Sequence, residues 1–350
     1  MFSVDGKNIE INGPPFVIAE MSGNHNHSLE RALKIVEAAA NVGVDALKIQ
    51  TYTADTMTID SQNIDFMIND EKNLWNGQSL YQLYQKAYTP WEWHEIIFKK
   101  CRELGIIGFS TPFDVTAVDF LEDLKVPCYK VASFENTDHI LLKKIASTHK
   151  PVFISTGMAT FDEISESISL LRDNGCPSIA MLKCTSSYPA LPNESNIITI
   201  QDIRKKFPDC LVGLSDHTMG FGVAVASIAL GSSIIEKHFT LSRADGGVDS
   251  AFSMEPEEMR QLIEECRKCW QSIGEVNYGP TNSEIRSLKY KRSLYFVNNL
   301  KKGKKITALD IRSIRPGLGL PTKYYDSIIG RCVVKDVERG TPVSWDLVGG

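Results

Sequence analysis

Eight short runs of apolar and β-branched residues recur along the first 240 positions of the chain, and segments with apolar residues at helical spacing separate most of them. The predicted strands cover residues 15–20, 46–50, 106–111, 128–133, 151–156, 178–185, 210–215 and 233–239. The predicted helices cover residues 28–42, 91–104, 115–124, 138–147, 161–172, 198–207, 222–230 and 255–273. Eight β-then-α units predict an α/β fold of the (β/α)8 TIM-barrel type. A doubly wound open sheet is the main alternative, but no G-x-G-x-x-G follows the first predicted strand.

The loop after the second predicted strand, residues 51–89, is unusually long, polar and aromatic. Long loops at this position of a barrel are usually lids or specificity elements. A packed excursion with its own small hydrophobic cluster is the alternative, and the pattern leaves both open.

The pattern changes after Gly279 and Pro280, where a polar and basic stretch precedes short β-rich segments. Residues 300–311 and 337–348 are half-similar, each with a turn glycine, a β-branched run and an acidic residue. We therefore expect a barrel domain at 1–280, a linker at 281–290 and a small, pseudo-symmetric β-rich domain at 291–350.

Composition and charge exclude several classes of function. A net charge of −5 without a long Lys/Arg run argues against a nucleic-acid partner. No apolar stretch approaches the ~20 residues that span a bilayer, so no membrane partner is expected. Residues 1–13 lack the basic-then-apolar order of a secretory signal, and the eight cysteines are scattered. Cys266 and Cys269 form a CxxC without a companion motif and are interpreted as packing residues. These features favour a reduced, cytoplasmic protein.

Polar residues stand at the end of every predicted strand, which is where a barrel builds its active site. His217 and His238 follow the last two strands, and a pair so placed can face one cavity and bind one metal ion. One such histidine alone is more often a core or surface residue. The other strand-end positions are Glu20, Lys48, Gln50, Thr111, Lys130, Ser133, Glu135, Ser155, Thr156, Lys183, Ser215 and Glu236.

Three of these strand-end residues are lysines, and together Lys48, Lys130 and Lys183 suit a small polyanion such as a phosphate ester with a carboxylate. Neighbouring hydroxyls would add donors to the phosphate oxygens. Glu135 is a candidate acid/base, because burial raises the pKa of a carboxyl group. An ordinary ion pair with a nearby lysine is the alternative for Glu135. Glu20 and the loop at residues 24–27 could bind a polyol, or the loop residues could simply form a turn.

At these positions the chain resembles the sialic acid synthase family. The matching motifs are IAEMSGNHNHS (18–28), LKIQTY (47–52), STPFD (110–114), YKVASFEN (129–136), ISTGMA (154–159), LKCTSSYP (182–189), GLSDHT (213–218) and EKHFT (236–240). The small domain resembles that family's antifreeze-like (SAF) domain, with IRPGLGL (314–320) as its marker. Within the family, residues 51–59, 74–94, 184–189 and 248–253 are most similar to pseudaminic acid synthases. Synthases that use N-acetylmannosamine typically have asparagine at the position of Ser186.

The resemblance implies a reaction in which phosphoenolpyruvate condenses with an open-chain amino-sugar aldehyde and phosphate is released. It implies a divalent metal ion (Mn²⁺, Mg²⁺ or Co²⁺) on His217 and His238, and a proton-handling role for Glu135. It places phosphoenolpyruvate on Lys48, Thr111, Lys130, Ser133, Ser155, Ser186 and Ser215. Glu20, Gln50, Tyr188 and Asp249 match positions near the metal or the sugar, with Glu20 counted among the catalytic residues. It also implies a homodimer with exchanged C-terminal domains, in which Arg315 reaches the partner's sugar site.

The favoured acceptor is 2,4-diacetamido-2,4,6-trideoxy-altrose. The alternatives are an N-acetylneuraminate or legionaminate synthase that uses N-acetylmannosamine or a related amino sugar, and a carbohydrate-binding protein without activity. A 6-deoxy sugar predicts an apolar contact for its methyl group, and Trp75 in the long loop is the candidate.

Overall fold

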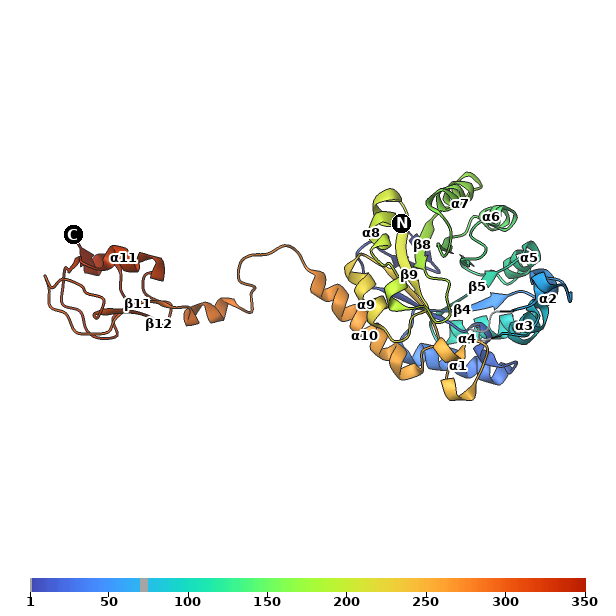
Figure 1. Ribbon diagram of the computed structural model, residues 1–350, viewed down its shortest axis with the longest axis horizontal. Coiled ribbons are helices and arrows are strands. Elements are labelled where there is room, and N and C mark those ends of the chain that lie inside the picture. Colours follow the sequence, from blue (N-terminus) through green and yellow to red (C-terminus); the bar gives the residue numbers. More distant parts are fainter. Residues whose placement is uncertain (1, 70–74) are drawn as a thin grey trace. The chain divides into compact units, whose positions relative to one another are not determined.

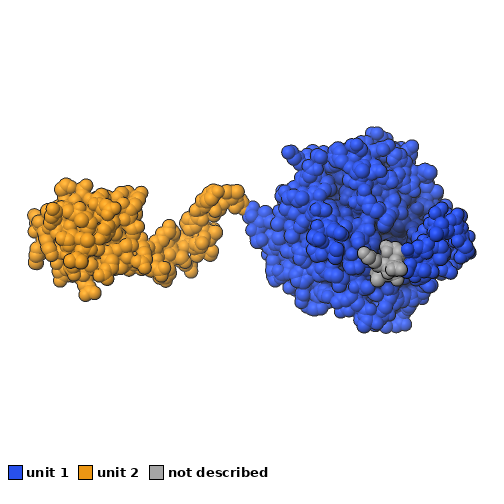
Figure 2. All heavy atoms as spheres, in the orientation of Figure 1, with its two compact units in different colours: residues 1–274 blue, residues 275–350 orange. Residues whose placement is uncertain are grey.

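The computed structural model describes residues 2–69 and 75–350 and divides the chain into two compact units, Met1–Gly274 and Glu275–Gly350. Figure 2 colours the two units separately. The division falls before the predicted linker, and residues Ile285–Tyr290 within that predicted linker form a short 3-10 helix. Among the described residues, no helix is long and apolar enough to cross a membrane.

The structure confirms the predicted barrel (Figure 1). Eight parallel strands close on themselves in chain order, and helices alternate with them along the chain. The strands are β3 (Phe16–Glu20), β4 (Ala46–Thr51), β5 (Ile107–Pro112), β6 (Tyr129–Val131), β7 (Val152–Ser155), β8 (Ile179–Cys184), β9 (Leu211–Asp216) and β10 (Ile234–His238). The helices of the repeating units are α1 (Leu29–Val42), α4 (His94–Glu103), α5 (Val115–Asp123), α6 (His139–Ala146), α7 (Phe161–Asp173), α8 (Thr199–Lys206), α9 (Gly222–Ala229) and α10 (Pro256–Ile273).

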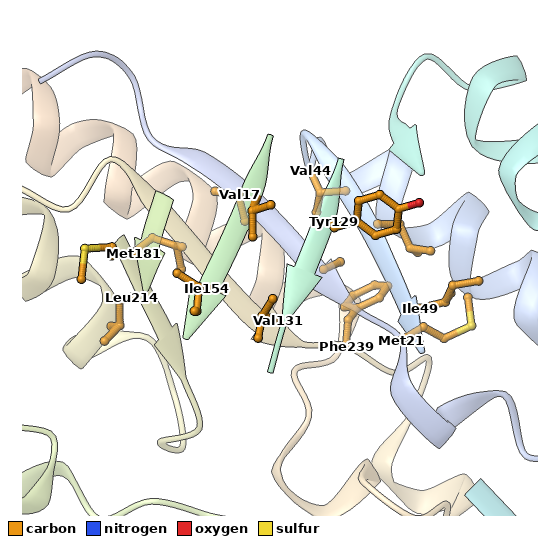
Figure 3. Packing of buried hydrophobic residues seen from close by; sticks show 14 of the residues in the cluster. Val17, Met21, Val44, Ile49, Tyr129, Val131, Ile154, Met181, Leu214 and Phe239 are labelled. Atoms are coloured by element: carbon orange, nitrogen blue, oxygen red, sulfur yellow. The ribbon is translucent and has the colours of Figure 1, made fainter. Parts of the chain in front are cut away.

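Successive residues of each strand belong to two different hydrophobic layers. In β4, for example, Ala46 lies in the cluster inside the barrel, whereas Leu47 and Ile49 pack in the layer shared with the helices. Figure 3 shows part of this outer layer, with Val131, Ile154 and Met181 from three adjacent strands. Because side chains alternate along a strand, this register also decides which polar residues at the strand ends face inward.

A short hairpin that the sequence pattern did not predict precedes the barrel. Its strands, β1 (Phe2–Val4) and β2 (Lys7–Ile9), pair in antiparallel fashion. Phe2, Val4 and Ile9 join the cluster inside the barrel, and the Phe2 ring lies 4.9 Å from that of Phe153. The hairpin therefore closes the N-terminal end of the barrel and leaves the C-terminal end for polar chemistry.

The long loop after β4 contains two helices, α2 (Ala54–Met57) and α3 (Leu80–Ala87). Its two ends are tied to the barrel by buried hydrogen bonds: Thr51 contacts His94 at 2.8 Å, and Thr89 contacts His25 at 3.2 Å. Leu83 and Ala87 of α3 are buried. The described part of this loop is therefore packed against the barrel, and α3 is one wall of the barrel mouth.

The smaller unit is built from short strands around its own apolar core. Its strands are β11 (Ser293–Phe296), β12 (Ile311–Ile314), β13 (Cys332–Val333) and β14 (Val348–Gly349), and its helix is α11 (Tyr325–Ile328). Leu300 and Val337, one from each of the two half-similar stretches, pair across an antiparallel bridge. The repeat seen in the sequence therefore corresponds to two segments that lie side by side.

Candidate functional site

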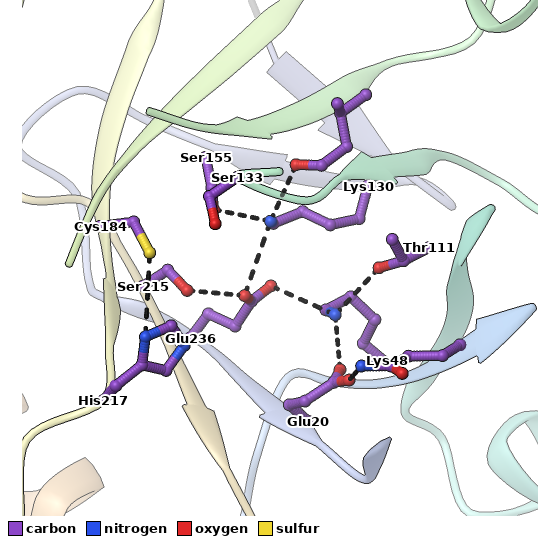
Figure 4. A network of polar contacts seen from close by, with 12 residues as sticks. Glu20, Lys48, Thr111, Lys130, Ser133, Ser155, Cys184, Ser215, His217 and Glu236 are labelled. Atoms are coloured by element: carbon purple, nitrogen blue, oxygen red, sulfur yellow. Dashed lines mark hydrogen bonds and ion pairs between the residues drawn. The ribbon is translucent and has the colours of Figure 1, made fainter. Parts of the chain in front are cut away.

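Two lysines and two glutamates at the strand ends form a buried charge network (Figure 4). Lys48 Nζ lies 2.6 Å from Glu20 Oε2 and 4.0 Å from Glu236 Oε2. Lys130 Nζ lies 3.7 Å from Glu236 Oε1, so Glu236 bridges the two ammonium groups. Hydroxyls complete the network: Lys48 donates to Thr111, Lys130 donates to Ser155, and Ser215 donates to Glu236. Gln50 donates to the other oxygen of Glu20.

The charges of this network are set by competition between burial and ion pairing. Burial alone would raise the pKa of Glu236, but the Lys130 and Lys48 cations outweigh it and hold that pKa below its ordinary value. Burial lowers the pKa of Lys130 in spite of Glu236. Burial likewise raises the pKa of Glu20 against the attraction of Lys48. The two ammonium groups are therefore already paired with two carboxyl groups, and an incoming anion must compete with Glu236 for them.

The lysine cluster predicted from sequence is partly wrong, because Lys183 lies on the other face of its strand. Ala180 and Leu182 of β8 face the barrel interior and Met181 faces the helices, so Cys184 points inward and Lys183 outward. The Lys183 ammonium donates to Thr185, and the residue lines a cavity of about 520 Å³ that is also bordered by α7, α8 and Ser186. Two lysines, Lys48 and Lys130, therefore remain in the network.

The histidines predicted as a metal pair do lie together at the rim of this network. The ring centroids of His217 and His238 are 5.4 Å apart. His217 Nδ1 lies 2.8 Å from the Thr185 carbonyl oxygen; if Nδ1 carries the proton, it donates to that oxygen and leaves Nε2 with a free lone pair. His238 Nδ1 is buried and has no hydrogen-bond partner among the described residues. Burial, together with the charges of His217 and Lys48, holds the pKa of His238 well below its ordinary value.

These observations fit a divalent metal ion, since neutral imidazoles are common metal ligands and a buried nitrogen without a partner is costly. Among the described residues, no group of three or more His, Cys, Asp and Glu side chains could hold a metal ion. The protein therefore offers two imidazoles, and water and substrate oxygens are needed to complete the coordination shell.

Aromatic and acidic residues surround the histidine pair. The Tyr188 ring lies 4.3 Å from that of His217, and the Phe252 ring lies 5.0 Å from that of His238. Asp249, on the loop after β10, accepts a hydrogen bond from Ser22, and burial raises its pKa. Tyr188 therefore packs against the histidine pair, and Asp249 lies close enough to feel the charge of His217.

Glu135 follows β6 in a turn rather than in the strand itself. Its Oε2 atom is buried and makes no hydrogen bond, and the described residues show no ion pair to its carboxylate. Burial raises the pKa of Glu135 to about 7, against the opposing effect of Lys130. The ion-pair alternative for Glu135 is therefore wrong in this structure, and its carboxyl group can change protonation state near neutral pH.

A close packing of small residues holds the serines on one side of the network. Ser186 donates to Ser133 at 2.7 Å. A Cβ atom on Gly157 would lie 2.3 Å from Ser133 Cβ and 2.9 Å from Ser186 Oγ, and the φ of Gly157 is +49°. Only glycine fits here, so Gly157, after β7, lets Ser133 from the loop after β6 meet Ser186 from the loop after β8.

The remaining predicted positions divide between the barrel and the smaller unit. Two residues of the loop at 24–27 make structural contacts: Asn24 donates to the Phe239 carbonyl and to Ser253, and His25 is buried against Thr89. Trp75 lines a cavity of about 400 Å³ whose other walls include Leu83, Val248 and Ala251. Arg315 follows β12 in the smaller unit, so its role at a partner's site stays a prediction.

Two residues of the site were not assigned a role from sequence. Glu236 was noted at a strand end, but its bridging of both lysines follows only from the inward register of β10. Phe252, against His238, lies on a 3-10 turn without a recognisable pattern.

Comparisons with known proteins identify the proteins that this chain is similar to. The model of the NeuB family matches residues 35–278, and that of the SAF domain matches residues 291–349. The chain is 38% identical to the pseudaminic acid synthase of Campylobacter jejuni strain 81-176 over 325 residues, which are 93% of this chain and 94% of that protein. It is 38% identical to that of Helicobacter pylori (95% and 97% covered), and 33% identical to the N,N'-diacetyllegionaminic acid synthase of Campylobacter jejuni (92% and 97% covered). The solved N-acetylneuraminic acid synthetase of Leptospira borgpetersenii, in complex with citrate, matches with a TM-score of 0.73 and 28% identity, covering 83% of this chain and 95% of that one.

Proposed function

The chain belongs to the NeuB family, and on that premise we propose that it is a pseudaminic acid synthase. In this reaction phosphoenolpyruvate condenses with the open-chain form of 2,4-diacetamido-2,4,6-trideoxy-β-L-altropyranose and with water, giving pseudaminic acid and phosphate. The observation that carries the proposal is the convergence of the histidine pair with the buried network of Lys48, Lys130 and Glu236.

Lys130 and the surrounding hydroxyls are proposed to bind phosphoenolpyruvate. Lys130 already donates to Ser155, and Ser133, Ser186, Ser215 and Thr111 supply further donors around the two ammonium groups. Charge-assisted hydrogen bonds of this kind are about twice as strong as neutral ones. Glu236 pairs with both lysines, so that neither ammonium group is an unpaired buried cation before the anion binds.

Chemistry at the aldehyde is proposed to take place beside His217 and His238. His217 and His238 would hold a divalent ion (Mn²⁺, Mg²⁺ or Co²⁺), which would supply Lewis-acid polarisation of the aldehyde oxygen. The methylene carbon of phosphoenolpyruvate forms the new bond to the aldehyde carbon, water adds to the carbon that carries the phosphate, and phosphate leaves. Glu135, with a pKa of about 7, can hold or release a proton at Oε2 during these steps. Glu20 positions Gln50 and Lys48.

The binding of phosphoenolpyruvate should weaken as the pH rises through about 7, beyond any effect of the ligand's own ionisation. Glu135 has a raised pKa of about 7, so it is neutral below that pH and becomes a carboxylate beside the bound anion above it. The side chain in Glu135→Gln is neutral at every pH, so this variant should not show the loss of phosphoenolpyruvate affinity above pH 7. Calorimetric titration of both proteins between pH 6 and 8.5 measures the difference. Parallel pH profiles for the two proteins would show that Glu135 does not titrate next to the anion.

A homodimer with exchanged C-terminal domains is proposed to complete the site through Arg315. Large apolar side chains are exposed on loops beside the strand ends, namely Phe134, Met158, Leu191 and Met219. The segment that leads to the smaller unit also exposes Val276, Tyr278 and Ile285. Exposed apolar groups of this kind mark protein contacts. Sedimentation of the full chain at the mass of a single chain would contradict this assembly.

A cytoplasmic location is also proposed. All eight cysteines are free thiols, as expected for a reducing compartment.

The proposed specificity is tested by measuring phosphate release with different acceptors. We expect kcat/KM for the diacetamido-trideoxy-altrose to exceed that for N-acetylmannosamine by about 100-fold. The polar and apolar groups of N-acetylmannosamine would not match those of a site built for the other sugar, and this mismatch weakens binding. The Trp75→Ala variant should lose part of its preference for the 6-deoxy sugar, since Trp75, Leu83 and Val248 supply apolar surface to one cavity.

Each alternative predicts a different outcome of that assay. Fastest turnover of N-acetylmannosamine would identify an N-acetylneuraminate synthase, and fastest turnover of a diacetamido-mannose would identify a legionaminate synthase. Sugar binding without phosphate release from any acceptor would favour the carbohydrate-binding protein. An unchanged sugar preference in Trp75→Ala would contradict the methyl contact.

A further inference from the structure

The inward alternation of β4 continues past the end of the strand to Tyr52. Ala46 faces the barrel interior, and Lys48 and Gln50 face the charge network. Thr51 points outward, where its hydroxyl contacts His94 and Ser110 in a buried cluster. Tyr52, two residues after Gln50, is therefore placed on the inner side, one layer closer to the mouth than the network.

The ring of Tyr52 is held in one orientation by aromatic neighbours. Tyr84 of α3 contacts it edge-on, with centroids 5.8 Å apart, and Phe113 contacts it edge-on at 5.1 Å. The Trp91 indole donates to the Tyr52 carbonyl oxygen. The whole residue is 3% exposed. Its phenol group is therefore positioned by the protein before any ligand binds.

The phenol oxygen of Tyr52 makes no hydrogen bond within residues 2–69 and 75–350, and unlike His238 Nδ1 it is not fully enclosed by protein atoms. Burial and the nearby carboxylates of Asp249 and Glu20 raise the pKa of Tyr52 well above its ordinary value. The phenol keeps its proton under all working conditions and is available as a donor.

The surroundings of Tyr52 favour a neutral ligand over an anion. Lys130 and Ser155, two of the residues proposed to bind phosphoenolpyruvate, lie on β6 and β7, whereas Tyr52 follows β4 beside Gln50. Asp249 and Glu20 place negative charge close to the phenol, which repels a phosphate or a carboxylate. Hydroxyl and acetamido groups carry no charge and can accept from the phenol while donating to a carboxylate.

We propose that Tyr52 is a further substrate-binding residue, whose phenol donates a hydrogen bond to an oxygen of the acceptor sugar. The inference rests on the proposed function, since it names a contact to the acceptor of that reaction. Tyr84 and Phe113 are positioning residues that fix the ring, and α3 of the long loop thereby takes part in acceptor binding. The loop is a specificity element through this contact.

Tyr52→Phe tests the inference, because it removes the hydroxyl and keeps the ring between Tyr84 and Phe113. We expect KM for the acceptor sugar to rise about 10-fold, as expected for one lost hydrogen bond to a buried group. KM for phosphoenolpyruvate, its calorimetric affinity and the melting temperature should stay unchanged. Tyr81→Phe is the matched control, since the Tyr81 hydroxyl donates to Asp55 on the exposed side of the loop. It should leave all these quantities unchanged.

An unchanged sugar KM in Tyr52→Phe would overturn the inference. An equal loss of affinity for the sugar and for phosphoenolpyruvate would also overturn it. So would a lower melting temperature with a lower kcat at constant sugar KM, because either result would show a structural role for Tyr52. The measurement uses whichever acceptor the wild-type enzyme turns over fastest. A wild type that prefers N-acetylmannosamine would therefore refute the proposed specificity and still give a decisive result for Tyr52.

Discussion

Replacing Lys130 by methionine is expected to weaken phosphoenolpyruvate binding by at least ~100-fold and to reduce turnover by at least as much. Lys130 is fully buried, and it is one of two inward-facing lysines at the strand ends in the described barrel. Losing one member of a buried charged pair costs about 2–5 kcal/mol in binding. Calorimetric titration of phosphoenolpyruvate into the variant measures the loss directly.

The same substitution should also destabilise the fold, which must be separated from the binding effect. Without Lys130, the Glu236 carboxylate faces only Lys48 at 4.0 Å, and breaking a buried pair in this way costs about 3–5 kcal/mol. The double variant Lys130→Met/Glu236→Gln should recover much of the stability but none of the binding. Lys150→Met, which breaks the partly exposed pair with Glu122, is the matched control and should bind normally. Tight binding by the double variant would show that the anion does not depend on Lys130.

Replacing His217 or His238 by alanine is expected to lower turnover by at least ~1000-fold, because a Lewis acid contributes several kcal/mol to the transition state. Each variant removes one of the two imidazoles whose rings lie 5.4 Å apart. Phosphate release measures the loss, and calorimetry with Mn²⁺ on metal-stripped protein should show that the ion no longer binds. Phosphoenolpyruvate should still bind to either variant, since Lys130 and the serines are intact.

Two other histidines serve as controls for this pair. His139 is partly exposed near Glu166, and His139→Ala should retain full activity and metal binding. His94 is buried with Thr51 on the outer face of the barrel, so its replacement should lower stability without changing the affinity for Mn²⁺. Retained Mn²⁺ affinity in both His217→Ala and His238→Ala would contradict the assignment of the ligands.

The barrel could be predicted from the sequence because each of its strands is buried on both faces and is bounded by turn residues. The hairpin at Phe2–Ile9 could not, since its two strands have three residues each and little alternation. Its residues are held by contacts inside the barrel, such as Phe2 against Phe153, that lie far apart in the sequence. Tertiary contacts rather than local pattern determine such an element.

The sequence predicted which strand ends carry the site, but it did not predict which side chains at those ends face the barrel interior. Lys183 was assigned to the anion site, although it lies one position away from the inward register that Leu182 and Cys184 follow. The same alternation, extended past Gln50, would have pointed to Tyr52. The pairing of Glu236 with both lysines depends on distances between strands, which a sequence pattern does not contain.

The most direct test of the account is the position of the metal ion relative to the anion. Crystals of the full chain grown with Mn²⁺ and phosphoenolpyruvate, measured for anomalous scattering by manganese, locate both ligands. We expect the manganese peak within bonding distance of a ring nitrogen of His217 and of His238, with the phosphate in contact with Lys130. Manganese bound away from these two imidazoles, or phosphoenolpyruvate bound away from Lys130, would contradict the condensation chemistry proposed for this barrel.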